Sequence, residues 1–254
     1  MNSDFTVVFA LYPRVTQLDF TGPLEVFARL PGANCLLAST TGVSIETGGI
    51  TFANLARLAD VTVCDLLCVP GGFGTIEAME DAEYLSQLRR LASQARFVTS
   101  VCTGSLLLAA AGLLRGKRAA CHWAWREMLT DFGVIPDAAR IVRDGNVISG
   151  GGVTAGIDMA LAVMAEIAGV DHAQTVQLAL EYAPEPPFDC GRPERARPEI
   201  VAAARARLDA GRAQREAAVQ RAVLALFNAN IDGRHRVGTD DGGRGRGSQS
   251  ISGS

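Results

Sequence analysis

The stretch RFVTSVCTGSLLLAAAGLL, residues 96–114, decides the fold. Residues 96–101 predict a buried strand, and residues 103–114 predict a helix that follows with no room for a loop. Residues 97–114 carry no charge, and a run of about 18 apolar residues can span a membrane. The first half of this run is rich in Thr, Ser, Cys and Gly, so a buried strand followed by a buried helix is favoured over a membrane span.

The same alternation of strands and helices recurs on both sides of this stretch. Continuous apolar runs predict buried strands, because a strand covered on both faces needs no polar positions. We expect strands at 5–11, 34–39, 64–69 and 118–120, hairpins at 43–52 and around 144–146, and helices at 21–30, 82–95, 123–132, 154–168 and 171–181. This pattern predicts an α/β fold with a mostly parallel sheet that is covered on both faces.

The composition is that of a globular protein. The chain has 254 residues, of which 48% are hydrophobic, and 24 basic against 27 acidic side chains give a net charge of −3. This balance gives no reason to expect a nucleic-acid partner, and no membrane partner is expected either. The N-terminal residues lack the basic segment of a signal peptide, and six cysteines without such a signal indicate reduced thiols. We therefore expect a cytoplasmic protein.

The character of the sequence changes beyond residue 190. One catalytic domain is predicted over residues 1–190, and residues 191–228 predict a proline-rich crossing and then a solvent-facing helix over 199–226. Residues 229–254 contain few apolar side chains, mostly Gly, Arg, Asp and Ser near the end. Such a segment cannot bury enough surface to offset its ordering entropy, so a disordered tail is expected.

Cys102 lies where the predicted strand meets the predicted helix. Small neighbours such as Ser100 and Gly104 are typical of a nucleophile elbow, a strained turn that projects a reactive side chain above the sheet edge. The N–H groups and the dipole of the following helix favour a thiolate. The alternative is a small cysteine packed in the core, but the position at the strand–helix junction favours a reactive site.

Pro70-Gly71-Gly72 ends the strand predicted at 64–69, at the sheet edge where α/β proteins form their sites. The two glycines let the backbone approach a ligand closely. The N–H groups of Gly72 and Thr103 are then a candidate pair for stabilising a developing negative charge. A tight turn is the alternative interpretation, and the segment does not fit a dinucleotide-binding fingerprint.

Asp19 lies between the first strand and its helix, with Leu18 and Phe20 beside it. A carboxyl in a partly buried cleft favours its protonated form, which suits a proton donor that orients a thiol. Asp19 as a helix cap is the alternative, and Glu25 is the competing carboxylate.

His122 is the only histidine in the predicted sheet region, and it either pairs with the thiol or packs beside Trp123. Cys64 and Cys68 are four residues apart within a strand, which does not match a zinc-ligand spacing. No metal and no cofactor is expected.

Together these residues resemble the ThiJ/PfpI group of the class I glutamine amidotransferase-like superfamily, over about residues 1–190. The resemblance rests on Val69 to Gly72, Ser100 to Gly104 and the acidic residue after the first strand. Within that group the chain looks similar to the isonitrile hydratases. The similar segments are Gln17 to Pro23, Thr99 to Gly104, Ala110 to Leu114, His122-Trp123, Gly150 to Asp158 and Leu180 to Pro184.

The resemblance implies a flavodoxin-like three-layer sandwich that forms a homodimer and works without a cofactor. It implies that Cys102 is the nucleophile, that Asp19 orients it and handles protons, and that Thr103 and Gly151 shape the pocket. The implied substrate is an isonitrile, which Cys102 attacks at its terminal carbon while Asp19 delivers a proton. Water then adds to the resulting thioimidate and expels the Cys102 thiolate, which releases an N-substituted formamide. Many relatives place His directly after the nucleophilic Cys, so Thr103 at that position weakens a peptidase interpretation.

Two other functions stay open. The same domain occurs as a ligand-sensing module at the N-terminus of AraC-type regulators. Those proteins need a further C-terminal pair of helix-turn-helix units, and residues 201–254 show no such pattern. A glyoxalase-like or stress-protective member of the superfamily would use the same Cys102.

Overall fold

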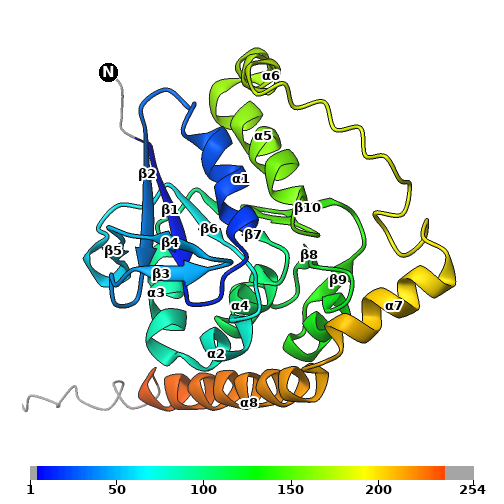
Figure 1. The fold of residues 1–254 in the computed structure, drawn as a ribbon. Coiled ribbons are helices and arrows are strands. Elements are labelled where there is room, and N and C mark those ends of the chain that lie inside the picture. The colour runs from blue at the N-terminus through cyan, green and yellow to red at the C-terminus, as the bar shows by residue number, and fades with distance from the viewer. Residues whose placement is uncertain (1–4, 238–254) are drawn as a thin grey trace, which may run out of the picture.

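The structure is a computed structural model that describes residues 5–237 (Figure 1). Its strands are β1 (Phe5–Leu11), β2 (Ala33–Ser39), β3 (Ile45–Thr47), β4 (Ile50–Phe52), β5 (Ala56–Arg57), β6 (Leu66–Val69), β7 (Phe97–Val101), β8 (Arg118–Ala120), β9 (Ile135–Asp137), β10 (Ile141–Asp144) and β11 (Val147–Gly150). Its α-helices are α1 (Gln17–Phe27), α2 (Thr75–Glu80), α3 (Ala82–Ala92), α4 (Gly104–Ala110), α5 (Ala155–Ala168), α6 (Val170–Ala179), α7 (Pro198–Leu208) and α8 (Arg212–Val237). Two 3₁₀ helices, η1 (Leu58–Asp60) and η2 (Arg126–Phe132), complete the described elements.

The central sheet has the strand order β10-β11-β7-β6-β1-β2-β5. Its pairs are parallel except for the β10–β11 hairpin at one edge. Helices α1 and α5 pack together over one face, and α2, α3 and α4 pack together over the other (Figure 1). The predicted three-layer α/β fold with a mostly parallel sheet is therefore confirmed.

Burial of the strands follows their positions in the sheet. Every residue of the central strand β1 is buried, as its continuous apolar sequence predicts. Strand β2, nearer the edge, is buried only at its C-terminal end. The carboxyl ends of β1, β6 and β7 therefore lie side by side in the best-packed part of the sheet, which fixes the loops that follow them.

Helix α1 begins earlier than predicted. The Thr16 N–H donates to the Gly71 carbonyl at 2.9 Å, and the Asp19 N–H donates to the Thr16 carbonyl at 3.1 Å, so the first turn is tied to the loop after β6. Pro23, expected in the first helical turn, lies inside the helix instead. Asp19 consequently belongs to the first turn of α1 and not to a preceding loop.

The C-terminal region differs most from the prediction. The single solvent-facing helix expected over 199–226 is wrong, because the chain forms α7 and α8 and breaks near Gly211. Helix α8 packs against α2, α4 and η2, and Figure 1 shows it running along the lower side of the molecule beneath α2. The buried residues of that face are Arg215, Ala218, Val219 and Ala222.

Two further segments complete the comparison with the expected elements. Helix α8 continues to Val237, into the stretch 229–254 that the sequence predicts as disordered, and residues 238–254 lie outside the described residues. The helix predicted over 123–132 is the 3₁₀ helix η2, which ends at Gly133 with a positive φ of 71°. No described helix has the length and apolar character needed to cross a bilayer.

Candidate active site

Cys102 occupies a strained turn between β7 and α4. Its φ is +59°, a left-handed conformation that is unfavourable for a residue with a Cβ. The Cys102 N–H donates to the Gly150 carbonyl at 3.1 Å, which fixes the turn to the neighbouring strand β11. The predicted nucleophile elbow is therefore present, and the surrounding sheet holds it in place.

Glycines let the neighbouring loop close onto this elbow. A Cβ at Gly71 would overlap the backbone nitrogen of Thr103, and a Cβ at Gly104 would overlap the carbonyl oxygen of Val69. Neither neighbour can move freely, because both are backbone atoms. The close approach brings the loop after β6 into direct contact with the nucleophile's turn.

Replacing Gly104 with alanine is expected to lower the free energy of unfolding by about 3 kcal/mol, because the new methyl group must displace a backbone carbonyl. Urea unfolding monitored by circular dichroism measures this loss. Gly191→Ala is the matched control, since a Cβ there meets open space, and we expect a change within about 0.5 kcal/mol. Equal unfolding midpoints for the two variants would contradict the packing described.

Asp19 lies fully buried beneath the elbow. Its Oδ2 accepts a hydrogen bond from the Gly71 N–H at 2.9 Å, and its Oδ1 has no hydrogen-bond partner among residues 5–237. Burial raises the pKa of this carboxyl from its ordinary value of 3.8 to about 7, although the Gly71 N–H and the Cys102 thiol lower it. Asp19 can thus gain or lose a proton near neutral pH, and Oδ1 is the open position for that proton.

The pKa of the Cys102 thiol is raised well above its ordinary value. Burial is the main cause, and the negative charge of Asp19 adds to it, while the Thr103 N–H lowers the pKa. The expected preference for a thiolate is therefore not found, because the short helix α4 does not compensate for the loss of solvent. This shift favours the protonated thiol over the thiolate.

Thr103 organises the polar groups next to the nucleophile. Its Oγ1 accepts the Gly72 N–H at 2.9 Å and shares a 2.9 Å hydrogen bond with Thr75 Oγ1. Thr75 also contacts the hydroxyl of Tyr12 at 3.1 Å, and that hydroxyl donates to the Pro70 carbonyl. The predicted pair of free N–H groups is therefore not formed, because the Thr103 side chain already uses the Gly72 donor.

Cys102 opens into a cavity of about 270 Å³ and is itself 5% exposed. This elbow cavity has an apolar wall and a few polar groups, as is usual for small-molecule sites. The residues that line it are Thr16, Gly72, Phe73, Thr75, Cys102, Thr103, Leu106, His122, Trp125, Val153, Leu208 and Arg215.

His122 lines the elbow cavity as a neutral ring. Burial lowers the pKa of the imidazole, and the nearby positive charge of Arg215 lowers it further. Its Nδ1 accepts the Ala124 N–H at 3.3 Å, which leaves Nε2 as the protonated nitrogen. The Nε2–H of His122 is therefore available as a hydrogen-bond donor at the cavity wall.

Two glycines predicted as binding residues do not line the elbow cavity. Gly71 lies behind it and holds Asp19. Gly151 lines an adjacent cavity of about 230 Å³ that shares His122 and Val153 with the elbow cavity, and its N–H is already bonded to the Arg140 carbonyl at 2.9 Å. The adjacent cavity contains no part of the elbow.

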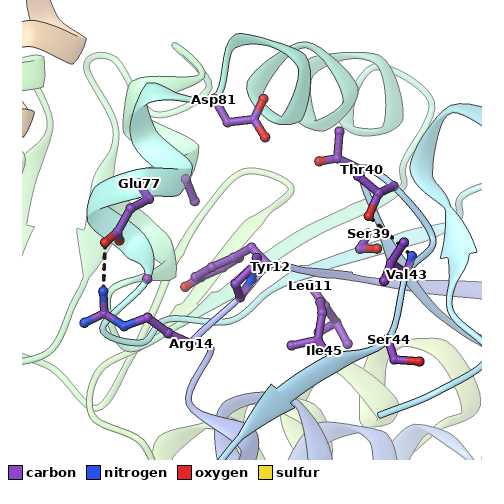
Figure 2. Close-up of a pocket in the computed structure, with 14 residues that line it drawn as sticks. Leu11, Tyr12, Arg14, Ser39, Thr40, Val43, Ser44, Ile45, Glu77 and Asp81 are labelled. Carbon is purple, nitrogen blue, oxygen red and sulfur yellow. Dashed lines mark hydrogen bonds and ion pairs between the residues drawn. The ribbon is translucent and has the colours of Figure 1, made fainter. Parts of the chain in front are cut away.

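A larger cavity of about 500 Å³ lies elsewhere on the molecule (Figure 2). Figure 2 shows Leu11, Tyr12 and Ile45 beside it, with an ion pair between Arg14 and Glu77 at its rim. It contains none of the sequence-predicted site residues and no cysteine. Volume alone would therefore favour this larger cavity, whereas the position of Cys102 favours the elbow cavity as the candidate active site.

Sequence analysis missed the part of the cavity wall that the C-terminal helices provide. Leu208 ends α7 and Arg215 lies in α8, and both line the elbow cavity together with Trp125. The buried positions of α8 recur at intervals of three and four residues. This spacing is present in the sequence and predicts a buried helix face. No group of His, Cys, Asp or Glu side chains that could hold a metal ion occurs among residues 5–237.

Fold and site together define a three-layer α/β protein with a cysteine on a nucleophile elbow beside a buried carboxyl. Residues 5–166 match the sequence profile of the DJ-1/PfpI family, and the chain belongs to that family. It is 51% identical over 200 residues to isonitrile hydratase of Pseudomonas putida, which covers 78% of this chain and 88% of that enzyme.

Two further comparisons bear on the alternatives. The transcriptional regulator CdhR of Pseudomonas aeruginosa is 31% identical over 186 residues, but the match covers 69% of this chain and only 54% of the regulator. The crystal structure of a ThiJ/PfpI family protein from Pseudomonas syringae superposes with a TM-score of 0.82 at 35% identity, covering 85% of this chain and 91% of that one.

Proposed function

We propose that this protein is an enzyme that adds water to an isonitrile and releases an N-substituted formamide. One observation carries the proposal: Cys102 lies on the elbow over the fully buried Asp19, in a chain that is 51% identical to an isonitrile hydratase. The similarity to the regulator is weaker and stops at about half of the regulator's length. A ligand-sensing role or a glyoxalase-like reaction is therefore the less supported alternative.

The first step forms a covalent intermediate. Ionised Asp19 accepts the proton of the Cys102 thiol while the sulfur attacks the terminal carbon of the isonitrile. The same carboxyl then returns the proton to that carbon, which gives the thioimidate R–N=CH–S–Cys. The pKa of about 7 supports this role, because Asp19 can both accept and donate a proton near neutral pH.

The second step releases the product. Asp19 removes a proton from a water molecule as the water oxygen attacks the thioimidate carbon, and the carboxyl passes this proton to the nitrogen, which gives R–NH–CH(OH)–S–Cys. When this tetrahedral intermediate collapses, Asp19 takes the hydroxyl proton, the Cys102 thiolate leaves and R–NH–CHO is released. Asp19 then returns the proton to the sulfur. The N–H of Thr103, which already lowers the pKa of the thiol, stabilises the negative charge on sulfur.

A small alkyl isonitrile tests the function directly. We expect the unmodified chain to convert tert-butyl isonitrile to N-tert-butylformamide, detected by chromatography, faster than buffer alone. The adduct of Cys102 with the substrate is expected as a mass shift on the peptide that contains it. Methylglyoxal, offered in parallel, is the control for the glyoxalase-like alternative, and turnover of methylglyoxal without turnover of the isonitrile would reject the hydratase.

The pH dependence follows from Asp19. Because the ionised carboxyl is the base in the first step, kcat/KM for tert-butyl isonitrile is expected to rise with pH through an apparent pKa near 7 and then to level off. Initial rates between pH 5.5 and 9 measure this profile. A rate that still rises between pH 8 and 9 would instead indicate that ionisation of the thiol alone controls the reaction.

We also infer that the protein acts as a cytoplasmic homodimer without nucleic-acid or membrane partners. The free thiols of Cys35, Cys64, Cys68, Cys102, Cys121 and Cys190 support a reducing compartment. Light scattering of the purified chain tests the dimer and is expected to give twice the mass of one chain.

A further inference from the structure

The elbow cavity contains a charged group that the hydration steps do not use. Arg215 lies on the buried face of α8, is only 7% exposed, and lines the cavity together with Cys102. Among the described residues of the cavity wall it is the only side chain with a formal charge at neutral pH. The guanidinium therefore gives the wall of this cavity a positive charge.

The Arg215 side chain is held in a fixed position. The carbon at the centre of its guanidinium lies 3.6 Å from the centre of the Trp125 ring, and its Nη1 donates to the Leu208 carbonyl at 3.4 Å. Stacking of this kind orients the planar guanidinium but does not neutralise it. The remaining N–H donors of the guanidinium make no hydrogen bond within the described residues.

Burial lowers the pKa of the Arg215 guanidinium, and the negative charge of Asp209 raises it. The acidic residues beside Arg215 nevertheless form their ion pairs with another arginine. Arg212 pairs with Glu216 at 2.8 Å and with Asp209 at 3.8 Å. Arg215 itself makes no ion pair with any described residue. An unpaired charge that is nine-tenths buried is costly, and a bound anion would complete the pair.

We propose that Arg215 binds a carboxylate of the substrate, so that the preferred isonitrile carries a carboxylate group. This inference rests on the proposed hydration and names its substrate class. The planar fork of a guanidinium binds both oxygens of a carboxylate. The elbow cavity of about 270 Å³ limits the substrate to a small molecule, with its isonitrile carbon at Cys102 and its carboxylate at Arg215.

Isocyanoacetate and its methyl ester test this proposal as a charged and a neutral probe. In the unmodified protein we expect kcat/KM to be about 10- to 100-fold higher for isocyanoacetate than for the ester, the usual range for a hydrogen bond to a charged group. Arg215→Met is expected to lower this ratio of kcat/KM values at least tenfold, mainly by raising KM for isocyanoacetate. Arg215→Lys keeps the positive charge but loses the planar fork of the guanidinium. We expect its ratio of kcat/KM values to lie between those of the unmodified protein and Arg215→Met.

Arg221→Met is the matched control, since it removes an arginine of the same helix that pairs with Glu80 and does not line the elbow cavity. We expect the ratio between the two probes to remain that of the unmodified protein. A ratio near one in the unmodified protein, or equal losses on both probes in Arg215→Met, would overturn the carboxylate proposal while leaving the hydration intact.

A binding measurement separates this inference from the reaction. N-formylglycine, the product expected from isocyanoacetate, and N-formylglycine methyl ester need no turnover to bind. By calorimetry we expect N-formylglycine to bind the unmodified protein at least tenfold more tightly than the ester does, and Arg215→Met to lose this preference. If no isonitrile is hydrated, the proposed function fails, and this titration still supports or rejects the anion site; equal affinities would reject it.

Discussion

Cys102→Ala is expected to reduce the hydration of tert-butyl isonitrile by a factor of about 10⁴ or more, because the thioimidate cannot form without the sulfur. The fold is expected to be unaffected. Alanine keeps the Cβ that makes the φ of +59° unfavourable, so the backbone strain is the same in both proteins. The removed atom faces the elbow cavity, and few packing contacts are lost with it.

Two measurements separate a chemical loss from a structural one. Urea unfolding of Cys102→Ala is expected to differ from that of the unmodified chain by less than about 1 kcal/mol. Cys64→Ala is the control for a general effect of removing a thiol. Cys64 is also buried, but it does not line the elbow cavity, and its variant is expected to retain activity. Full turnover by Cys102→Ala would refute the covalent mechanism.

The sequence was sufficient to predict the elbow because its signal is local. A charge-free strand that passes into a helix without a loop leaves one backbone arrangement for Cys102, and the structure has it. The glycines of the loop after β6 predict a close backbone approach to a ligand, whereas in the structure Gly71 lies close to the Thr103 backbone. The mostly parallel sheet follows from the alternation of strands and helices, whereas the order of its strands was not predicted.

The charge state of the site could not be predicted in the same way. The N-terminus of α4 is visible in the sequence, and it favours a thiolate in isolation. Desolvation and the charge of Asp19 act in the opposite direction, and they depend on how deeply the folded protein buries both groups. The Gly72 N–H is a similar case, because its use by Thr103 Oγ1 depends on a side-chain position that no spacing specifies.

The wall built by α7 and α8 was missed for a compositional reason. The buried stripe of α8 consists of one arginine, two alanines and one valine, which have little hydrophobic contrast with the exposed face. Its helical spacing was present in the sequence, but an arginine at the first buried position suggests solvent rather than a cavity. Functional residues that break the hydrophobic pattern in this way are found only when the fold is known.

Asp19→Asn is expected to have two opposite effects, a loss of activity of about 10³-fold and a gain in stability above pH 7. The amide cannot carry the proton between the thiol, the substrate carbon and water, and general acid–base catalysis is typically worth about 10² to 10⁴. Glu25→Gln is the matched control. Glu25 lies on the same helix but faces solvent in an ion pair with Arg29, so its variant is expected to keep full activity.

The gain in stability follows from the raised pKa of Asp19. Between its ordinary value of 3.8 and about 7 the folded protein binds a proton that the unfolded chain releases, so stability falls as the pH rises through this window. At about 1.4 kcal/mol per pKa unit, the buried charge costs roughly 4 kcal/mol above pH 7. An amide carries no such cost, and its oxygen can still accept the Gly71 N–H. Urea unfolding at pH 5 and pH 8 is therefore expected to show Asp19→Asn gaining more at pH 8; an inactive variant that is also less stable at pH 8 would mean that Asp19 supports the fold rather than the chemistry.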